Sequence, residues 1–450
     1  MVVWCSNNKW LSFFFAAVLF LGLSAALYKA VPSRHSHFDR DSVGYDRIAR
    51  TFVATGHLAD PGVRGGIPIQ PIGYPLLIGL LYTFFGPDVR SVIVLQLVLS
   101  LLCIGLIFVI AGRLFAQPIA KVALFLSAIN LGFLVYAQLL LAETLMLTFL
   151  LLFFERLTAC MRDQKIMQLA QAGLVLGLSV LVKPMALLFI FLLLPFVWVC
   201  VYRIAHVWRK LSAVGVLLVS FYLPLIGYMG YNYSEYGYFR YAPMTSLNIY
   251  QCYLSKVIAA VDELPVEEVR TQKLIFTGVH GFDESGWQVG RQLLPVYLKK
   301  QPLVFVHIWV VNIIKTLFGL YATQLKLLLN PDLVGGSHSF FKISGTVCER
   351  CVAYIVGGSP TSFVAGIALG EFIWNWIRWL LVIGACWLLV WRRKWCLLYL
   401  LGSYTFQCAL VTGIDGCCRY RMTFEPILIM LSAIGIYALY CYWLKKECVL

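Results

Sequence analysis

The ionisable residues best suited to chemistry in this chain stand at the edges of long apolar segments, where a charged side chain is costly to bury. Asp41 follows the first apolar segment, Glu143 begins another, and Lys183 lies between two more. Arg419 and Arg421 stand just before the last one. A carboxylate at a membrane edge is partly desolvated, which raises its pKa and makes it a better general base. Arginine holds phosphate oxygens through paired hydrogen bonds, so the set indicates proton abstraction beside a bound phosphate.

Each of these residues also has a purely structural interpretation. Asp41, or Ser42 beside it, could cap a helix by accepting free backbone amides. Glu143 could turn outwards to water, or it could orient an acceptor or support the base. Lys183 and the two arginines could pair with Asp415 or Glu425.

Two further observations refine the candidate site. Lys183 falls on the external side of the expected spans, against the positive-inside trend, and we therefore expect it to face an anion. Asp39 is the substitute for Asp41 as base. The "DRD" at 39–41 could be taken for a metal-binding pair of carboxylates, but we favour a site without metal.

Composition places these residues in a membrane protein. The chain has 450 residues, of which 61% are hydrophobic and 13% charged. Its apolar runs reach the length of about 20 residues that a helix needs to cross a bilayer, and they lack the alternation of a barrel strand. The prediction is an all-α bundle of about 10–12 transmembrane helices, with amphipathic juxtamembrane helices outside. The formal net charge of +15 has no compact basic domain to carry it, so a nucleic-acid partner is not expected.

The expected topology is a single integral membrane domain over residues 1–450. Basic clusters at 161–165, 203–210, 391–395 and 444–447 are typical of cytoplasmic loops. The predicted spans are 10–31, uncleaved, 89–112, 118–139, 142–157, 169–183, 185–203, 211–230, 371–391, 395–413 and 425–444. Twelve spans is the alternative.

The external face is then formed by three regions. Residues 32–88 are the first external loop, and 231–370 are a larger region in which 301–322 is expected to lie in the membrane interface. The C-terminal part, 371–450, carries an external loop at 413–425. Within the first loop, apolar positions from Ser42 to Thr55 fall on one helical face, Asp46 can pair with Arg50, and Gly56 ends the helix.

Several functions lack support in the sequence. It has no G-x-G-x-x-G, no Walker A motif and no internal repeat, and no cofactor is expected. Most cysteines lie in apolar runs and predict no disulfide framework. Cys348 with Cys351, and Cys417 with Cys418, are expected to be free thiols or at most one disulfide rather than metal ligands.

The first external loop resembles that of a known family. Asp41 is followed four residues later by Tyr45, then by a helix ending in "TG", and then by "PIGYPLLIGLLYTFFG", which contains Tyr74. This order is similar to GT-C glycosyltransferases that use polyprenyl-phosphate sugars, in the bacterial branch of aminoarabinose lipid A transferases and protein O-mannosyltransferase relatives. Ile72 departs from the proline common in that pattern. Segments 136–152, 173–189, 231–250 and 418–431 resemble later parts of the same family, in the same order.

The resemblance implies a glycosyltransferase of the bacterial inner membrane with its active site facing the periplasm or exterior. It would take sugar from a polyprenyl-phosphate donor and pass it, with inversion, to a lipid, glycan or protein acceptor, using Asp41 as base and no nucleotide. Glu143 would support catalysis. The expected substrate contacts are Asp39, Tyr45, Tyr74, Lys183, Arg419, Tyr420 and Arg421. The alternatives are a lipid-linked glycan flippase or transporter, and a polymerase or ligase using diphosphate-linked donors.

Overall fold

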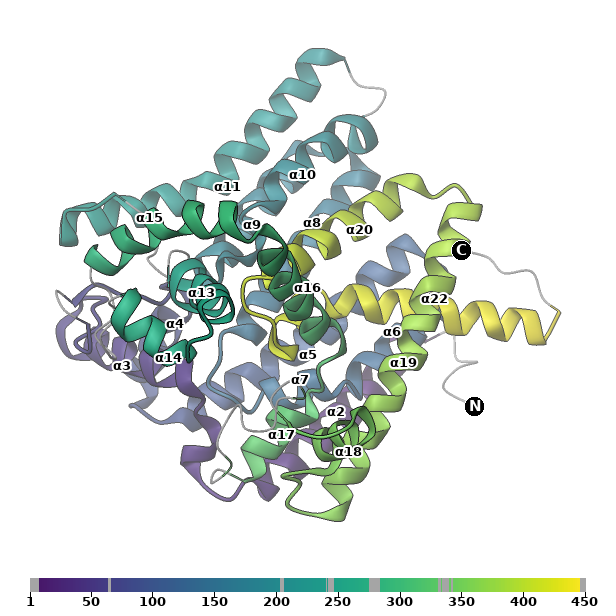
Figure 1. The fold of residues 1–450 in the computed structure, drawn as a ribbon. Coiled ribbons are helices and arrows are strands. Elements are labelled where there is room, and N and C mark those ends of the chain that lie inside the picture. Colours follow the sequence, from purple (N-terminus) through teal and green to yellow (C-terminus); the bar gives the residue numbers. More distant parts are fainter. Residues whose placement is uncertain are drawn as a thin grey trace.

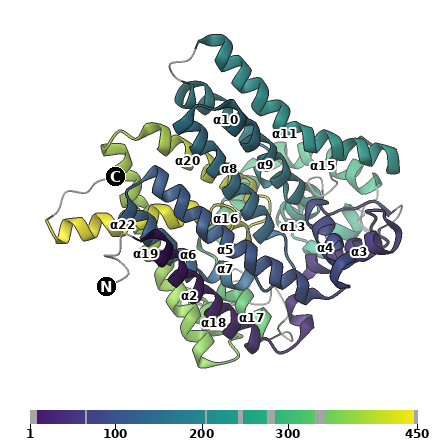
Figure 2. The same ribbon diagram turned by 180° about the vertical axis from the view of Figure 1, so that it is seen from behind.

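The computed structural model describes residues 8–63, 66–202, 206–239, 241, 247–274, 284–330, 333, 340 and 343–445. Throughout these ranges the chain forms helices joined by short loops, with no strand. Figures 1 and 2 show long helices gathered into a bundle, with shorter helices packed at one side and one end of it. The predicted all-α membrane bundle is confirmed.

Seven helices are long and apolar enough to cross a membrane, counted over the described residues. They are α2 (Lys9–Ala30), α5 (Val89–Leu114), α8 (Glu143–Asp163), α11 (Val207–Tyr236), α19 (Ser362–Trp391), α20 (Trp395–Thr412) and α22 (Glu425–Trp443). Each coincides with one of the ten predicted spans. The other three predicted spans coincide with the shorter apolar helices α6 (Gln117–Ala128), α9 (Ile166–Val182) and α10 (Phe189–Phe196), the last continued by η4 (Val197–Val201).

Two of the predicted boundaries differ from the structure. The span expected at 118–139 is broken, because Asn130 accepts a hydrogen bond from the backbone of Phe133 and so begins a second helix, α7 (Leu131–Tyr136). The span expected from residue 371 begins nine residues earlier, where the Thr361 side chain caps the backbone amide of Val364.

Residues 32–88, predicted as the first external loop, contain a helix over the predicted amphipathic stretch. Helix α3 (Arg40–Thr55) buries Tyr45, Ile48 and Ala49 on its apolar face and packs against α4 (Gly73–Phe85). Asp46 pairs with Arg50 at 2.7 Å. The left-handed backbone of Gly56, at φ 76°, ends the hydrogen-bonded turn of the helix.

Residues 231–370, predicted as the larger external region, contain a second, smaller core. Helix α13 (Ser255–Asp262) packs there with η5 (Asn248–Leu254), α14 (Val266–Glu268), η6 (Val269–Lys273), α15 (Glu284–Lys300) and α16 (Pro302–Phe318). Helices α15 and α16 meet at 104°, so the apolar run at 301–322 is one arm of a sharply bent pair. Its interfacial placement stays a prediction.

Two more helices lie near the N-terminal end of α19. They are α17 (Ala322–Leu329) and α18 (Val347–Val356), and both contact α19. The buried Lys326 of α17 donates hydrogen bonds to the backbone carbonyls of Tyr354, Ile355 and Gly357. This cation therefore neutralises the C-terminal carbonyls of α18 and ties the two helices together.

Candidate active site

Four charged side chains from distant parts of the chain meet in one charge cluster: Asp41, Glu143, Lys183 and Arg419. Arg419 Nη1 lies 2.7 Å from Asp41 Oδ2. The Nε of Arg419 also forms an ion pair with Glu143 Oε1. The same Glu143 oxygen forms a second ion pair with Lys183 Nζ. The sequence predicted these four residues as site candidates, and the structure brings them into contact.

The ends of helices hold these groups in place. Glu143 is the first residue of α8, where a helix N-terminus stabilises negative charge. Lys183 follows the last residue of α9 in an extended conformation, as the next residue, Pro184, requires. Arg419 lies on the short helix α21 (Cys418–Arg421) inside the loop before α22. Three helix termini and one loop thus converge on the cluster.

Hydrogen bonds join the segment before α3 to the segment before α8. The backbone N–H of Leu140 donates to His37 O at 2.9 Å, and Ser42 Oγ donates to Leu140 O at 2.8 Å. His37 Nδ1 lies 2.7 Å from Gln138 O. Burial lowers the pKa of His37, against the raising effect of that hydrogen bond, so the ring is neutral and donates from Nδ1. The chain carrying Asp41 is therefore fixed to the chain that leads into Glu143.

The two carboxylates differ in exposure. The Asp41 side chain keeps 39% of its surface exposed, whereas Glu143 keeps 2%. Glu143 Oε2 is buried without a hydrogen-bond partner in the described part of the chain. Asp41 is thus the carboxylate that a substrate can reach, while Glu143 holds the two cations together.

The sequence prediction of a raised Asp41 pKa is wrong. Burial does push this pKa upwards, but the charges of Arg419 and Lys183 and the hydrogen bonds from Arg419 and Gln70 outweigh it, so the pKa lies below its ordinary value. Desolvation at the membrane edge was visible in the sequence, whereas the two cations in direct reach of this carboxylate were not. Asp41 therefore remains ionised to a lower pH than a free aspartate does.

The aromatic candidates line the same region in different ways. Tyr45 is buried one helical turn after Asp41 and meets Tyr74 edge to face at 5.0 Å. Tyr74 is also buried, and its hydroxyl donates to Gln96 at 2.7 Å. Lys183 Nζ lies 5.7 Å from the centre of the Tyr420 ring, a distance suited to a cation–π contact.

Asp39 lies directly before α3, and its backbone N–H donates to Ser42 Oγ at 2.8 Å. The carboxylate that reaches Arg419 is that of Asp41, two residues later.

Arg421 does not join the charge cluster. It is fully buried and pairs with Glu425 at 3.1 Å and Glu371 at 3.4 Å, and it donates to the carbonyls of Leu317 and Gly319. These bonds support the structural interpretation of Arg421, with Glu425 as its partner. Asp415, the other partner considered, pairs instead with Lys256 at 2.7 Å.

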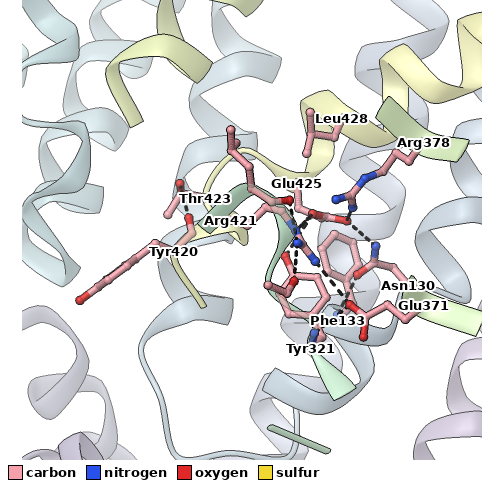
Figure 3. Close-up of polar contacts among 12 residues, drawn as sticks. Asn130, Phe133, Tyr321, Glu371, Arg378, Tyr420, Arg421, Thr423, Glu425 and Leu428 are labelled. Atoms are coloured by element: carbon pink, nitrogen blue, oxygen red, sulfur yellow. Dashed lines mark hydrogen bonds and ion pairs between the residues drawn. The ribbon is translucent and has the colours of Figure 1, made fainter. Parts of the chain in front are cut away.

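Figure 3 shows the buried polar network around Arg421, which also contains Asn130, Tyr321, Glu371, Arg378 and Glu425. Glu425 accepts from Arg378 at 2.8 Å, from Asn130 at 2.9 Å and from Tyr321 at 3.1 Å. The side chain of Tyr420 points away from this network in Figure 3. Arg419 and Arg421, two residues apart, consequently serve two separate polar centres.

Sequence reasoning missed several of these residues. Gln70, whose side chain helps to lower the pKa of Asp41, stands directly before the "PIGYP" element and could have been noticed there. Arg378 and Glu371 lie inside a predicted span or at its edge, where an ionisable residue is itself a signal. Asn130 is uncharged and gave no such signal.

No metal centre is evident among the residues that the structure describes: they contain no group of three or more His, Cys, Asp or Glu side chains arranged to hold an ion. Cys348, Cys351, Cys417 and Cys418 are all free thiols. The predicted segment 231–250 lies partly outside the described residues, as do the basic clusters at 203–210 and 444–447.

Comparison with known proteins agrees with this architecture. Residues 69–226 match the family described as dolichyl-phosphate-mannose-protein mannosyltransferase. No curated protein matches the chain in sequence.

Among solved structures, the fold resembles the Archaeoglobus fulgidus oligosaccharyltransferase tethered with an acceptor peptide, with a TM-score of 0.56 and 13% identity over 97% of this chain and 50% of that chain. The apo form of that enzyme gives a TM-score of 0.52 and 15% identity, over 98% of this chain and 52% of that one. ArnT from Cupriavidus metallidurans bound to undecaprenyl phosphate gives 0.41 and 14%, over 96% of this chain and 79% of that chain.

The chain thus spans about half the length of the archaeal enzyme. The likeness is one of fold, and it agrees with the predicted GT-C-like bundle of helices. The family match covers residues 69–226, about a third of the chain.

Proposed function

We propose that this integral membrane protein transfers a sugar from a polyprenyl-phosphate donor to an envelope acceptor on the external face, with Asp41 as general base. The charge cluster is the observation that carries the proposal. It joins one exposed carboxylate to two cations, which is the equipment needed to deprotonate a hydroxyl and to stabilise a departing phosphate. The description of the matched family names dolichyl-phosphate-mannose, which is a sugar carried on a lipid phosphate. This supports a donor of the same class.

Proton transfer falls to Asp41 because of its exposure. The attacking hydroxyl of the acceptor gives its proton to the carboxylate while its oxygen forms the new bond to the anomeric carbon. The bond from that carbon to the phosphate oxygen breaks, and the electron pair leaves with the lipid phosphate. Glu143 is buried and bonded to both cations, so it is not available as a second nucleophile, and a single displacement inverts the anomeric centre.

Arg419 would change partners during this reaction. Its Nη1 holds Asp41 in the structure, and the incoming phosphate competes for the same guanidinium. When Arg419 turns to the phosphate, the main charge that lowers the pKa of Asp41 moves away, and the carboxylate becomes a stronger base. Donor binding would therefore activate the base.

The test is transfer of label. Purified protein is incubated with radiolabelled polyprenyl-phosphate sugars and a membrane extract, and the component that gains label is identified. We expect wild type to transfer label and Asp41→Asn to lose at least about a hundredfold in rate, as loss of a general base does.

Asp88→Asn is the matched control. Asp88 is an external aspartate whose side chain caps α5, and asparagine caps a helix equally well. Transfer that survives in Asp41→Asn would refute the assignment of the base. Wild-type protein that moves an intact lipid-linked sugar across vesicles without transferring it would instead support a flippase.

A further inference from the structure

The amide of Gln70 lies directly against the candidate base. Its side chain comes close enough to the Asp41 carboxylate to lower the pKa of that group as a hydrogen-bond donor. It also lies over α3 at Gly44, where a Cβ would meet Gln70 Nε2 at 3.4 Å and Cγ at 3.5 Å. Because an ionised carboxylate only accepts hydrogen bonds, the amide nitrogen of Gln70 must be the atom that faces Asp41.

The other end of this amide is unused. Gln70 Oε1 is buried and has no hydrogen-bond partner within the described ranges. A buried amide oxygen without a donor is uncommon and unfavourable. The amide therefore offers one unused acceptor beside Asp41, and a ligand that carries hydroxyl groups would supply the missing donor.

We propose that Gln70 positions the acceptor: its Nε2 fixes the Asp41 carboxylate, and its Oε1 accepts a hydrogen bond from a second hydroxyl beside the attacking one. The attacking hydroxyl has one proton, which goes to Asp41, so Gln70 must take its hydrogen bond from a neighbouring group. Adjacent hydroxyls of this kind occur on a sugar ring, and the inference therefore favours a carbohydrate acceptor. It rests on the proposed function.

Substitutions of Gln70 separate this role from a structural one. Gln70→Ala removes both hydrogen bonds, and we expect kcat/KM for the acceptor to fall by about tenfold to a hundredfold. Gln70→Glu places a second carboxylate beside Asp41, and repulsion between like charges raises the Asp41 pKa. The acid limb of the pH–rate profile should then move to higher pH by about one unit.

Other groups around Asp41 are left unchanged by these variants. Its charged and titratable neighbours are Arg419, Lys183, Glu143, Tyr45, Tyr420 and Cys252. Gln301, exposed on the external side before α16, supplies matched controls as Gln301→Ala and Gln301→Glu. Both controls should keep the wild-type profile.

Binding of unsugared undecaprenyl phosphate in nanodiscs completes the experiment. We expect Gln70→Ala to bind it within about twofold of wild type, because Gln70 acts on the acceptor. Wild-type rates and an unmoved acid limb in both variants would overturn the inference, and so would a parallel loss of undecaprenyl phosphate binding. Wild-type protein that transfers no sugar to any acceptor would overturn the proposed function and this inference together.

Discussion

The exchange of partners at Arg419 makes a prediction about binding that differs from the one about catalysis. In Asp41→Asn the guanidinium loses a competing anion, so we expect the variant to bind undecaprenyl phosphate more tightly than wild type while it fails to transfer sugar. An ordinary loss-of-function variant would lose both properties.

The magnitude follows from the Arg419–Asp41 pair. A hydrogen bond to a charged group contributes about 1.5–3 kcal/mol, but exposed ion pairs contribute only about 0–1 kcal/mol. Asp41 is 39% exposed and Arg419 is 12% exposed, so the pair lies between these limits. We take about 1–2 kcal/mol, which corresponds to about 5- to 30-fold tighter binding at 1.4 kcal/mol per tenfold.

The assay is displacement of a radiolabelled polyprenyl phosphate from protein in nanodiscs, measured at low and high salt. Wild type, Asp41→Asn and the Asp88→Asn control are compared in parallel. The gain in Asp41→Asn should shrink as salt screens the charges. Equal or weaker binding by Asp41→Asn at low salt would refute the exchange of partners.

Three further predictions concern the same loop. Arg419→Gln removes the largest charge that lowers the pKa of Asp41. The acid limb of the pH–rate profile, measured on the residual activity, should therefore lie at higher pH than in wild type, and coincident limbs would contradict this. Glu425→Gln leaves the buried guanidinium groups of Arg378 and Arg421 poorly neutralised and should destabilise the protein by about 3–5 kcal/mol. The measurement is the unfolding temperature in detergent, which should fall. An unchanged unfolding midpoint would exclude a stabilising role for the polar network around Arg421. A Cβ at Gly416 would collide with the backbone of α16, so Gly416→Ala should lower both transfer and phosphate binding, whereas Gly402→Ala, with open space around it, should change neither.

Much of the architecture could be predicted because lipid imposes simple rules on sequence. Apolar runs of about the length of a membrane-crossing helix marked the long helices. The break at Asn130 could not be read in the same way, because a single uncharged residue capping a new helix leaves the surrounding apolar run intact.

The charge cluster could be predicted only as a set of residue types. Asp41, Glu143, Lys183 and Arg419 stood out because each lies where a charge is costly, and that criterion is independent of the fold. It could not separate Arg419 from Arg421, since both stand in the same short segment, and only the packing of α21 sends them to different partners.

The direction of the Asp41 pKa was predicted wrongly for a related reason. Sequence shows that a residue lies near the membrane edge, but the sign of the shift depends on which charges come within a few ångströms. Those distances are fixed by contacts between residues hundreds of positions apart.

The hydrogen bonds between the segment before α3 and the segment before α8 have a mechanical consequence. Hydrogen bonds of His37 and Ser42 attach the segment that carries Asp41 to residues 138–140. We therefore expect the carboxylates of Asp41 and Glu143 to move together. Arg419 belongs to a different segment, the loop at 413–425. This loop is bound to α16 through Asn312 and to α13 through Asp415. Any widening that admits a bulky lipid headgroup would then separate these two segments, and it would have to break the bonds of Arg419 to both Asp41 and Glu143.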